Sequence, residues 1–305
     1  MLIRKYPWVL AVVAVLAMAA AASDAAQRQS GTENAEKETV DSQAYIRLQT
    51  EEKSPHSLQV AVVRCVPKDP AAKPVTVDLV SAIHVGEKSY YEQLNREFRN
   101  YDSVLYELVA PEGARIPQGG PQENRSHVST VQGGLKDLLE LSFQLEEIDY
   151  TVDNMVHADM SPEQFAKTMQ RRGESFLGMF LRMMGYSMAK QQGGQSSDME
   201  LLAAMFSQNR ALALKRVMAE QFTDMEGSLL AINGADGSTI ISERNKVALD
   251  VLRKQLDAGK QKLAIFYGAG HMPDMLKRLQ DDFGLRADKT RWLVAWDLRD
   301  EKEKK

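Results

Sequence analysis

Hydrophobic and polar positions alternate in two ways along the chain, and each pattern predicts a different element. Short apolar runs rich in β-branched residues predict strands, whereas apolar residues three and four positions apart predict helices. The first two runs, Tyr45–Leu48 and Leu58–Cys65, are joined by the polar residues Glu51–His56, which predicts a hairpin. Cys65 ends an apolar run, so it is interpreted as a buried core residue.

The next elements follow a strand–helix–strand order. Val75–Ile83 predicts a strand, Glu87–Tyr101 carries apolar residues at helical spacing, and Val104–Val109 predicts another buried strand. This order implies parallel strands joined by a crossover helix. The C-terminal part predicts a helix, a strand, a helix and a last strand: Ile240–Leu256, Lys262–Tyr267, Met272–Phe283 and Arg291–Leu298.

A long stretch separates these two halves. Residues 111–130 are rich in proline, glycine and polar residues and predict a loop, whereas about 132–230 predict a mainly helical insert. One helix start is marked by Ser161, with Pro162 after it and a capping-box Gln164. The fold prediction is therefore one α/β domain over residues 43–299, with a mixed, partly parallel sheet flanked by helices and split by this insert.

The insert holds eleven of the fifteen methionines, most densely over Phe176–Ala189. Methionine fills irregular cores, so a core seam of the insert is one interpretation. A flexible lid over an apolar substrate is a second, and contact with a membrane surface is a third. The sequence leaves these three interpretations open.

The two ends of the chain differ in composition from the predicted domain. Arg4 and Lys5 precede the uncharged run Trp8–Ala22, and small residues follow, which predicts a signal peptide over residues 1–26 and export to the periplasm or the outside. An uncleaved membrane anchor is the alternative. Residues 27–42 are polar and predict a disordered spacer, and residues 300–305 form a charged tail.

The composition and the absence of known motifs exclude several classes of function. The net charge is −4 and the basic residues are spread out, which argues against a nucleic-acid partner. A single cysteine excludes an internal disulfide and a cysteine-rich metal site. The sequence patterns of zincin proteases, serine hydrolases, P-loop enzymes and dinucleotide-binding enzymes are all absent.

Ionisable residues follow the predicted parallel strands. His84 follows the first, Glu107 lies within the second, and His271 comes after the third. Ligands of open α/β sheets bind at the carboxyl ends of the strands, so these side chains are expected to converge. Glu107 lies in an apolar run and needs a cationic partner there. Arg244 lies on the apolar stripe of its helix, where it either reaches solvent or pairs inside a site.

A second polar cluster precedes Ser161. It contains Asp149, Asp153, His157 and Asp159, in a stretch that is not itself predicted to be helical. An acidic collar near the N-terminus of the next helix is one interpretation. Asp149 or His157 reaching over the main site is the other, and both residues are kept as secondary candidates.

Four segments together resemble the TraB/GumN/TIKI superfamily: SAIHVG from Ser81, YELVAP from Tyr106, ISERN from Ile241 and FYGAGHMPDM from Phe266. The family carries two GxxH-type motifs, a glutamate after the first and an arginine in a helix. The second motif, Gly268–His271, matches the pattern. The first departs from it, because Ser81 stands where the family usually has glycine.

The resemblance implies a fold similar to erythromycin-esterase-like and ChaN-like proteins. It implies a site for a divalent metal, manganese, cobalt, iron or zinc, held by His84, Glu107 and His271. Glu107 and Arg244 would then serve catalysis, with secondary candidates around the motifs: Ser81, Tyr267, Gly268 and Gly270. Two histidines and one carboxylate suit a transition metal with open positions.

The functional prediction is an exported, metal-dependent, peptidase-like hydrolase acting on a peptide or small molecule. The alternative is a non-catalytic binding or regulatory protein that sequesters a peptide, haem or metal in the same place. Catalytic loss on chelation would distinguish the two. The sequence predicts no particular oligomeric state.

Overall fold

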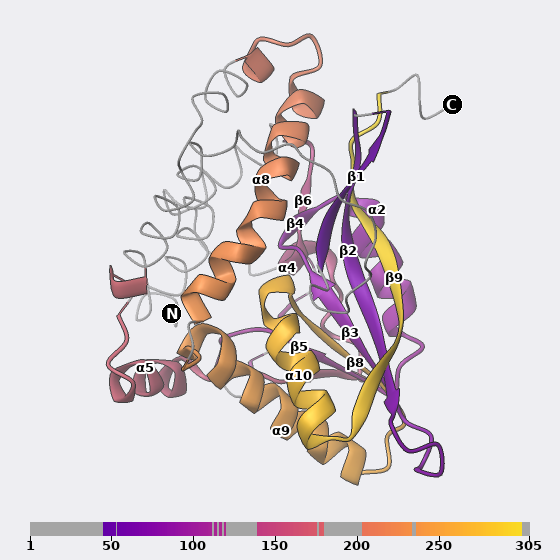
Figure 1. Cartoon of the computed structure of the whole chain (residues 1–305), viewed down its shortest axis with the longest axis vertical. Helices are drawn as coiled ribbons and strands as arrows, with labels where there is room; N and C mark the ends of the chain where they lie inside the picture. Colours follow the sequence, from indigo (N-terminus) through magenta and orange to yellow (C-terminus); the bar gives the residue numbers. More distant parts are fainter. Residues whose placement is uncertain are drawn as a thin grey trace, which may run out of the picture.

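The computed structural model (Figure 1) describes most of the chain beyond residue 44. The described residues are 45–52, 54–111, 113–114, 116–117, 119, 139–175, 177–179, 203–233 and 236–300. The predicted signal peptide, the spacer and residues 301–305 of the tail lie outside these ranges. Among the described helices, none combines the length and the apolar character needed to cross a membrane.

A seven-stranded mixed sheet forms the centre of the molecule. Its strands are β1 (Ile46–Glu51), β2 (Ser54–Pro67), β3 (Thr76–Ala82), β5 (Ser103–Tyr106), β7 (Met155–His157), β8 (Lys262–Gly268) and β9 (Leu285–Asp297). The long β2 pairs antiparallel with β1, β3 and β9. Beyond β2 the order is β3-β8-β5-β7, and each neighbouring pair of these four strands is parallel.

Helices cover both faces of the sheet because its strands are apolar on both sides. On one face, α2 (Lys88–Phe98) packs Tyr90, Leu94 and Phe98 into a cluster with residues of β2, β5 and β8. On the other, α9 (Arg244–Asp257) and α10 (Met272–Asp282) share a second cluster with β3, β5 and β8. The helix α8 (Arg210–Asn233) adds residues to the first cluster.

The predicted hairpin and the parallel core are confirmed, with strand bounds that differ by a few residues. The last strand, β9, begins six residues before the predicted Arg291, because it pairs with β2 along nearly the whole length of both strands. Cys65 is buried as expected, and burial raises the pKa of its thiol to about 12. The helix after Ser161 is α5 (Pro162–Arg171), and its capping box is formed.

Two short strands lie within the stretch between about 132 and 230 that the sequence predicts to be mainly helical, and the second of them falls in the part around Asp149–Asp159 that is not predicted to be helical. One is β6 (Ser142–Phe143), which pairs with β4 (Val85–Gly86) in a two-stranded ladder. The other is β7, which pairs with β5 at an edge of the main sheet. These strands are two and three residues long, so their own apolar pattern is too short to indicate a strand.

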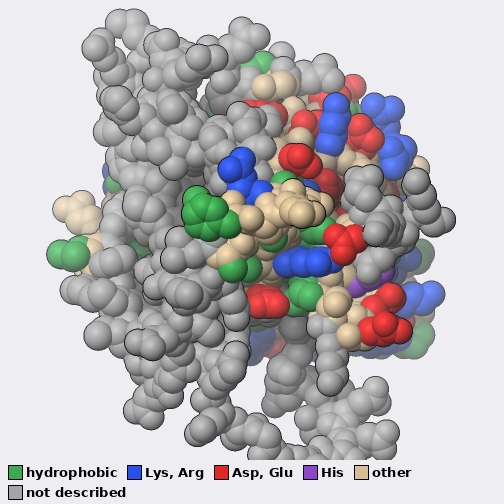
Figure 2. All heavy atoms as spheres, turned by 90° about the horizontal axis from the view of Figure 1, so that it is seen from above, with side chains coloured by type: hydrophobic (Ala, Val, Ile, Leu, Met, Phe, Trp, Pro, Cys, Tyr) green, Lys and Arg blue, Asp and Glu red, His purple; other side chains and the backbone are tan. Residues whose placement is uncertain are grey.

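The methionine-rich stretch Phe176–Ala189 falls mostly outside the described residues. Two of its described side chains differ in exposure. Met179 is buried beside Phe165 and Met169 of α5, whereas Leu177 is 67% exposed. The first placement agrees with a core seam of the insert. On the face shown in Figure 2, acidic and basic side chains of the described residues are interspersed.

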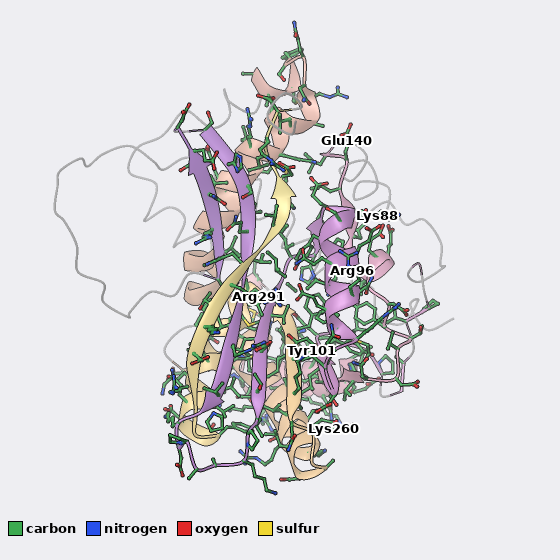
Figure 3. All side chains as sticks on the ribbon, turned by 90° about the vertical axis from the view of Figure 1, so that its right-hand side faces the viewer. Lys88, Arg96, Tyr101, Glu140, Lys260 and Arg291 are labelled. Carbon is green, nitrogen blue, oxygen red and sulfur yellow. The ribbon has the colours of Figure 1, made fainter. Side chains whose placement is uncertain are left out.

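A buried carboxylate ties the antiparallel and parallel parts of the sheet together. Asp78 of β3 is 1% exposed and accepts two hydrogen bonds from Arg64 of β2, both 2.9 Å long. It accepts a third from the hydroxyl of Tyr101, which lies just beyond α2 beside the sheet (Figure 3). The charge of Asp78 is thus compensated where burial alone would disfavour it.

Replacing Asp78 tests this tie. We expect Asp78→Ala to lower the free energy of unfolding by about 2 to 3 kcal/mol, because charge-assisted hydrogen bonds of a buried group are lost. Urea unfolding measures the change. As a control, Asp281→Ala removes the partner of the exposed Lys277 and should cost less than about 1 kcal/mol. Equal losses in the two variants would contradict the role given to Asp78.

Candidate functional site

The four parallel strands end at the same edge of the sheet, and each carries a residue of the candidate site at its end or just beyond it. His84 lies two residues beyond β3, and Glu107 follows β5 directly. Gly268 ends β8, and Asp159 lies two residues beyond β7. Parallel pairing therefore brings together residues that are far apart in the sequence.

Glu107 lies at the centre of these contacts. Its Oε2 accepts the backbone N–H of Gly268 at 2.7 Å, and its Oε1 accepts from Nη2 of Arg244 at 2.7 Å. Nε2 of His271 is 3.5 Å from Oε1. Burial would raise the pKa of Glu107, but the charges of Arg244 and His271 outweigh it and hold that pKa well below its usual range. Glu107 is therefore a fixed carboxylate at neutral pH.

Gly268 contributes its backbone N–H to the site. A Cβ at this position would stand 3.4 Å from Oε2 of Glu107 and 3.8 Å from the His271 ring, which is ordinary van der Waals contact. The hydrogen bond to Glu107 therefore comes from the backbone of Gly268 and does not require glycine. Gly270 lies in the following 3₁₀ turn, η3 (Ala269–His271).

Arg244 joins two carboxylates from neighbouring strands. Besides Glu107, it binds Asp159 through Nε–Oδ1 at 2.9 Å and Nη2–Oδ2 at 2.5 Å. Burial would lower the pKa of Arg244, but Asp159 and Glu107 together raise it well above its usual value. The side chain is 8% exposed, so of the two interpretations the internal pairing holds. The guanidinium and the two carboxylates together carry one net negative charge.

A turn of π-helix precedes Arg244. This turn, η2 (Thr239–Glu243), is capped by Ser238, whose hydroxyl accepts the N–H of Ile241. The α-helical part of the predicted helix therefore begins only at Arg244. Single π turns are rare and are frequent at functional sites.

The proton on His271 can be placed from its neighbours. Nδ1 is 2.6 Å from Oδ1 of Asn245, while Nδ2 of Asn245 donates to the His271 carbonyl and to Asp274. Both of those partners can only accept, which fixes the amide orientation. Nδ1 of His271 is therefore a donor. In the neutral ring Nε2 then carries a lone pair toward Glu107, and in the charged ring Nε2 donates to that carboxylate.

His84 has a similar partner but a different exposure. Its Nδ1 is 3.1 Å from Oε1 of Gln144, which belongs to the short helix α4 (Gln144–Glu147). A proton on Nδ1 leaves Nε2 free, as in His271. His84 is exposed. The charge that it can carry also lowers the pKa of Glu107, so the two residues lie in one electrostatic environment.

The distance between the candidate ligand atoms can be compared with the distance between two ligands of one metal ion. Two ligands about 2.1 Å from one tetrahedral ion lie roughly 3.4 Å apart. The distance of 3.5 Å between His271 Nε2 and Glu107 Oε1 matches this spacing. In the neutral ring a lone pair and a carboxylate oxygen face each other at this distance, and either a proton on Nε2 or a cation removes their repulsion. Among the described residues, no three His, Cys, Asp or Glu side chains converge closely enough to hold an ion.

Two secondary candidates lie under the site. Tyr267 packs edge-on against the His271 ring, 5.1 Å between centroids, and its hydroxyl donates to the Ala158 carbonyl. Burial and the charge of Asp159 raise the pKa of Tyr267 well above its usual value, so it keeps its proton. Ser81 pairs with Tyr267 across β3 and β8, and its buried Oγ has no partner within the described ranges.

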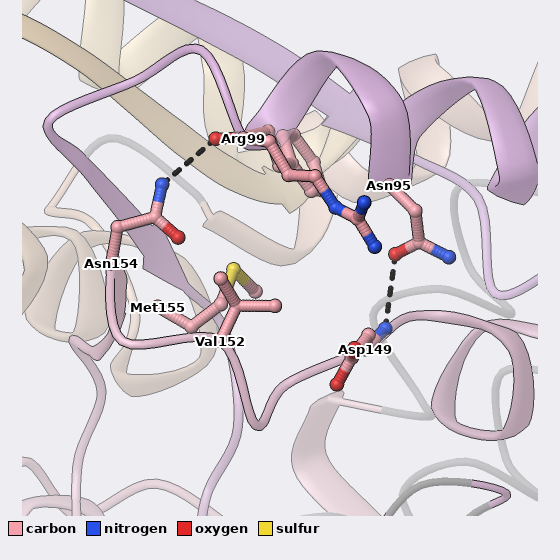
Figure 4. Close-up of a pocket in the computed structure, with 7 residues that line it drawn as sticks. Asn95, Arg99, Asp149, Val152, Asn154 and Met155 are labelled. Atoms are coloured by element: carbon pink, nitrogen blue, oxygen red, sulfur yellow. Dashed lines mark hydrogen bonds between the residues drawn. The ribbon is translucent and has the colours of Figure 1, made fainter.

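The other two secondary candidates do not join Glu107. Nε2 of His157 is 2.6 Å from the Leu108 carbonyl, and the ring lies beside Tyr106. Asp149 closes a turn with Thr151 and lines a small pocket with Asn95 and other residues (Figure 4). Asn154 also lines this pocket, and its carbonyl bonds Val104 near the start of β5, opposite the edge that carries Glu107.

Three contributors are not predicted as site residues by the sequence. In the sequence, Asp159 is recognised only as a member of the acidic cluster. The strand before it, β7, is too short to show an alternation of apolar and polar residues. Asn245 lies in the ISERN segment, directly after Arg244, and that adjacency is the available signal. Gln144 has no distinctive surroundings in the sequence, so nothing there indicates its contact with His84.

Comparisons with protein-family models, with curated proteins and with solved structures gave no match to this chain. The resemblance to the TraB/GumN/TIKI superfamily therefore stays a prediction. It rests on the residues of its four segments, SAIHVG, YELVAP, ISERN and FYGAGHMPDM. The chemistry of the site has to be inferred from its own geometry.

Asp159 can be tested against its neighbour in the same cluster. We expect Asp159→Asn to lower the free energy of unfolding by about 3 kcal/mol, because buried Arg244 loses a charged partner. Asp153→Asn changes an exposed residue and should cost less than about 0.5 kcal/mol. Denaturant unfolding of both variants measures the difference, and a loss below about 1 kcal/mol for Asp159→Asn would refute the pairing.

The depressed pKa of Glu107 predicts a pH dependence. Its folded pKa lies below the unfolded value of about 4.3, so its ionised form stabilises the fold fully above that pH. This contribution is lost as the pH falls through the folded pKa. The unfolding free energy of Glu107→Gln should therefore fall less steeply below about pH 4.3 than that of the wild type. Parallel curves would show that Glu107 is not paired in solution.

Proposed function

We propose that the protein is an exported, metal-dependent hydrolase of peptide or amide bonds. The observation that carries the proposal is the matched pair of histidines near Glu107. Each imidazole has Nδ1 within hydrogen-bond distance of a side-chain amide oxygen, so the neutral ring that donates from Nδ1 keeps its lone pair on Nε2. Metal-binding histidines have this arrangement, with the second nitrogen oriented by a hydrogen-bonded partner.

In the proposed site, His271 and Glu107 hold a divalent ion, manganese, cobalt, iron or zinc, and His84 joins them. The chemistry supplied by such a site is Lewis-acid activation of a carbonyl and of a water molecule. Glu107 stays ionised, so its role is to bind and not to donate a proton. Arg244 holds the Glu107 carboxylate in position and keeps it charged.

The predicted signal peptide supports a location outside the cytoplasm. Export would bring the site to peptides or small molecules of the periplasm or the surroundings. Residues 176–189 remain candidates for a lid or for contact with a membrane surface, on the strength of their apolar composition.

Metal content is the first test. The full chain is purified without affinity metal, incubated separately with manganese, cobalt, iron and zinc, and analysed for bound metal. We expect about one equivalent in the wild type and in the control His56→Ala, whose imidazole lies beside Glu51. His271→Ala and Glu107→Gln should lose it while their circular dichroism is retained. A wild type that binds none of these metals would refute the proposal.

Turnover is the second test. Cleavage of a peptide library by the metal-loaded protein should stop in excess chelator and return when the metal is restored. Activity that persists in chelator would exclude the metal mechanism. Metal binding without cleavage of any peptide would instead favour the non-catalytic binding protein.

A further inference from the structure

His84 is positioned by a segment that lies 60 residues away in the sequence. The ladder between β4 and β6 holds the backbone just after His84, at Val85 and Gly86. The backbone N–H of Gln144 donates to the carbonyl of His84 itself at 2.9 Å. Before His84, the hydroxyl of Tyr91 donates to the Ile83 carbonyl at 2.9 Å. The loop that carries His84 is therefore held on both sides.

The side chain of Gln144 continues this contact to the imidazole. Gln144 is 4% exposed, with Oε1 at 3.1 Å from Nδ1 of His84. Its Nε2 donates to the hydroxyl oxygen of Tyr150 at 2.9 Å. Tyr150 is itself buried, and its ring packs on Tyr106 with centroids 4.8 Å apart. The hydroxyl of Tyr150 holds the amide in place, with Nε2 of Gln144 toward Tyr150 and Oε1 toward His84.

We propose that Gln144, held in place by Tyr150, is a positioning residue that selects the tautomer of His84. In the orientation that the structure shows, the amide oxygen accepts only a proton carried on Nδ1, so it excludes the tautomer that carries the proton on Nε2. In the neutral ring the lone pair then lies on Nε2. The effect on tautomer is independent of any metal, whereas the effect on metal binding rests on the proposed hydrolase function.

The two amide–imidazole pairs differ in a way that makes Gln144 more consequential. His271 is buried, so packing against Tyr267 restrains its ring in addition to Asn245. His84 is exposed, and Gln144 is the side chain that binds its ring among the described residues. An exposed imidazole without that amide would sample both tautomers and other rotamers.

The tautomer can be measured directly by nitrogen-15 NMR of the histidine rings in the metal-free full chain, at alkaline pH where imidazole is neutral. We expect wild-type His84 to carry its proton on Nδ1. In Gln144→Leu the nitrogen signals of His84 should move to the values of a free imidazole, which samples both tautomers. In Tyr150→Phe they should move part of that way, because the amide of Gln144 can then rotate. Gln144→Glu should retain the wild-type tautomer, since a carboxylate oxygen also accepts the Nδ1 proton. Gln93→Leu, the same change at a half-buried position of α2 whose amide donates to Glu97, serves as the control.

Metal titration of the same variants gives the second readout. Gln144→Leu should weaken binding of manganese or zinc by roughly 10- to 100-fold, the range for lost partners of metal-binding histidines, whereas Gln144→Glu should not weaken it. If Gln144→Leu does not fold, the His84 tautomer in Tyr150→Phe is compared with that in Gln144→Glu. The inference requires that the tautomer change in the first variant and stay in the second. An unchanged His84 tautomer in the folded variants would overturn the inference. A Gln144-dependent tautomer in a protein that binds no metal would support it and refute the proposed function instead.

Discussion

The arrangement of the site depends on one buried arginine between two carboxylates. Glu107 and Asp159 follow neighbouring parallel strands, and without a cation their charges would repel each other across a poorly solvated gap. Arg244 compensates most of this repulsion and at the same time fastens α9 to the edge of the sheet. Removing Arg244 leaves two carboxylates without a cation inside the protein, whereas removing either carboxylate leaves the other one paired with Arg244 but takes hydrogen bonds from the guanidinium.

This group of three residues also sets the charge that the site offers to a ligand. One positive and two negative side chains leave one negative charge, and the lone pairs of two imidazoles add to the attraction for a cation. The backbone N–H of Gly268 offsets part of that charge on one oxygen of Glu107. The site is therefore suited to a positive centre by electrostatics as well as by the identity of its donors.

The parts of this structure that could be predicted from the sequence are those in which a local pattern has one physical solution. A glutamate within an apolar run requires a cation, and an arginine on an apolar stripe was an available partner, so the contact between Glu107 and Arg244 was foreseeable. Asp159 and Gln144 were not, because strands of two or three residues place them. Such strands are stabilised by pairing with distant segments, and no local periodicity reveals them.

The π-helical turn before Arg244 links the site to the length of the chain. Successive residues of an α-helix are rotated by about 100° around its axis, and a π turn contains one residue more than an α turn. The buried residues Ala248, Leu249 and Leu252 hold α9 against the sheet, so a deletion of one residue between Ser238 and Arg244 would close this turn as ordinary α-helix and leave the guanidinium in place. The turn thus accommodates one extra residue ahead of Arg244, and related chains of different length here could share the same site.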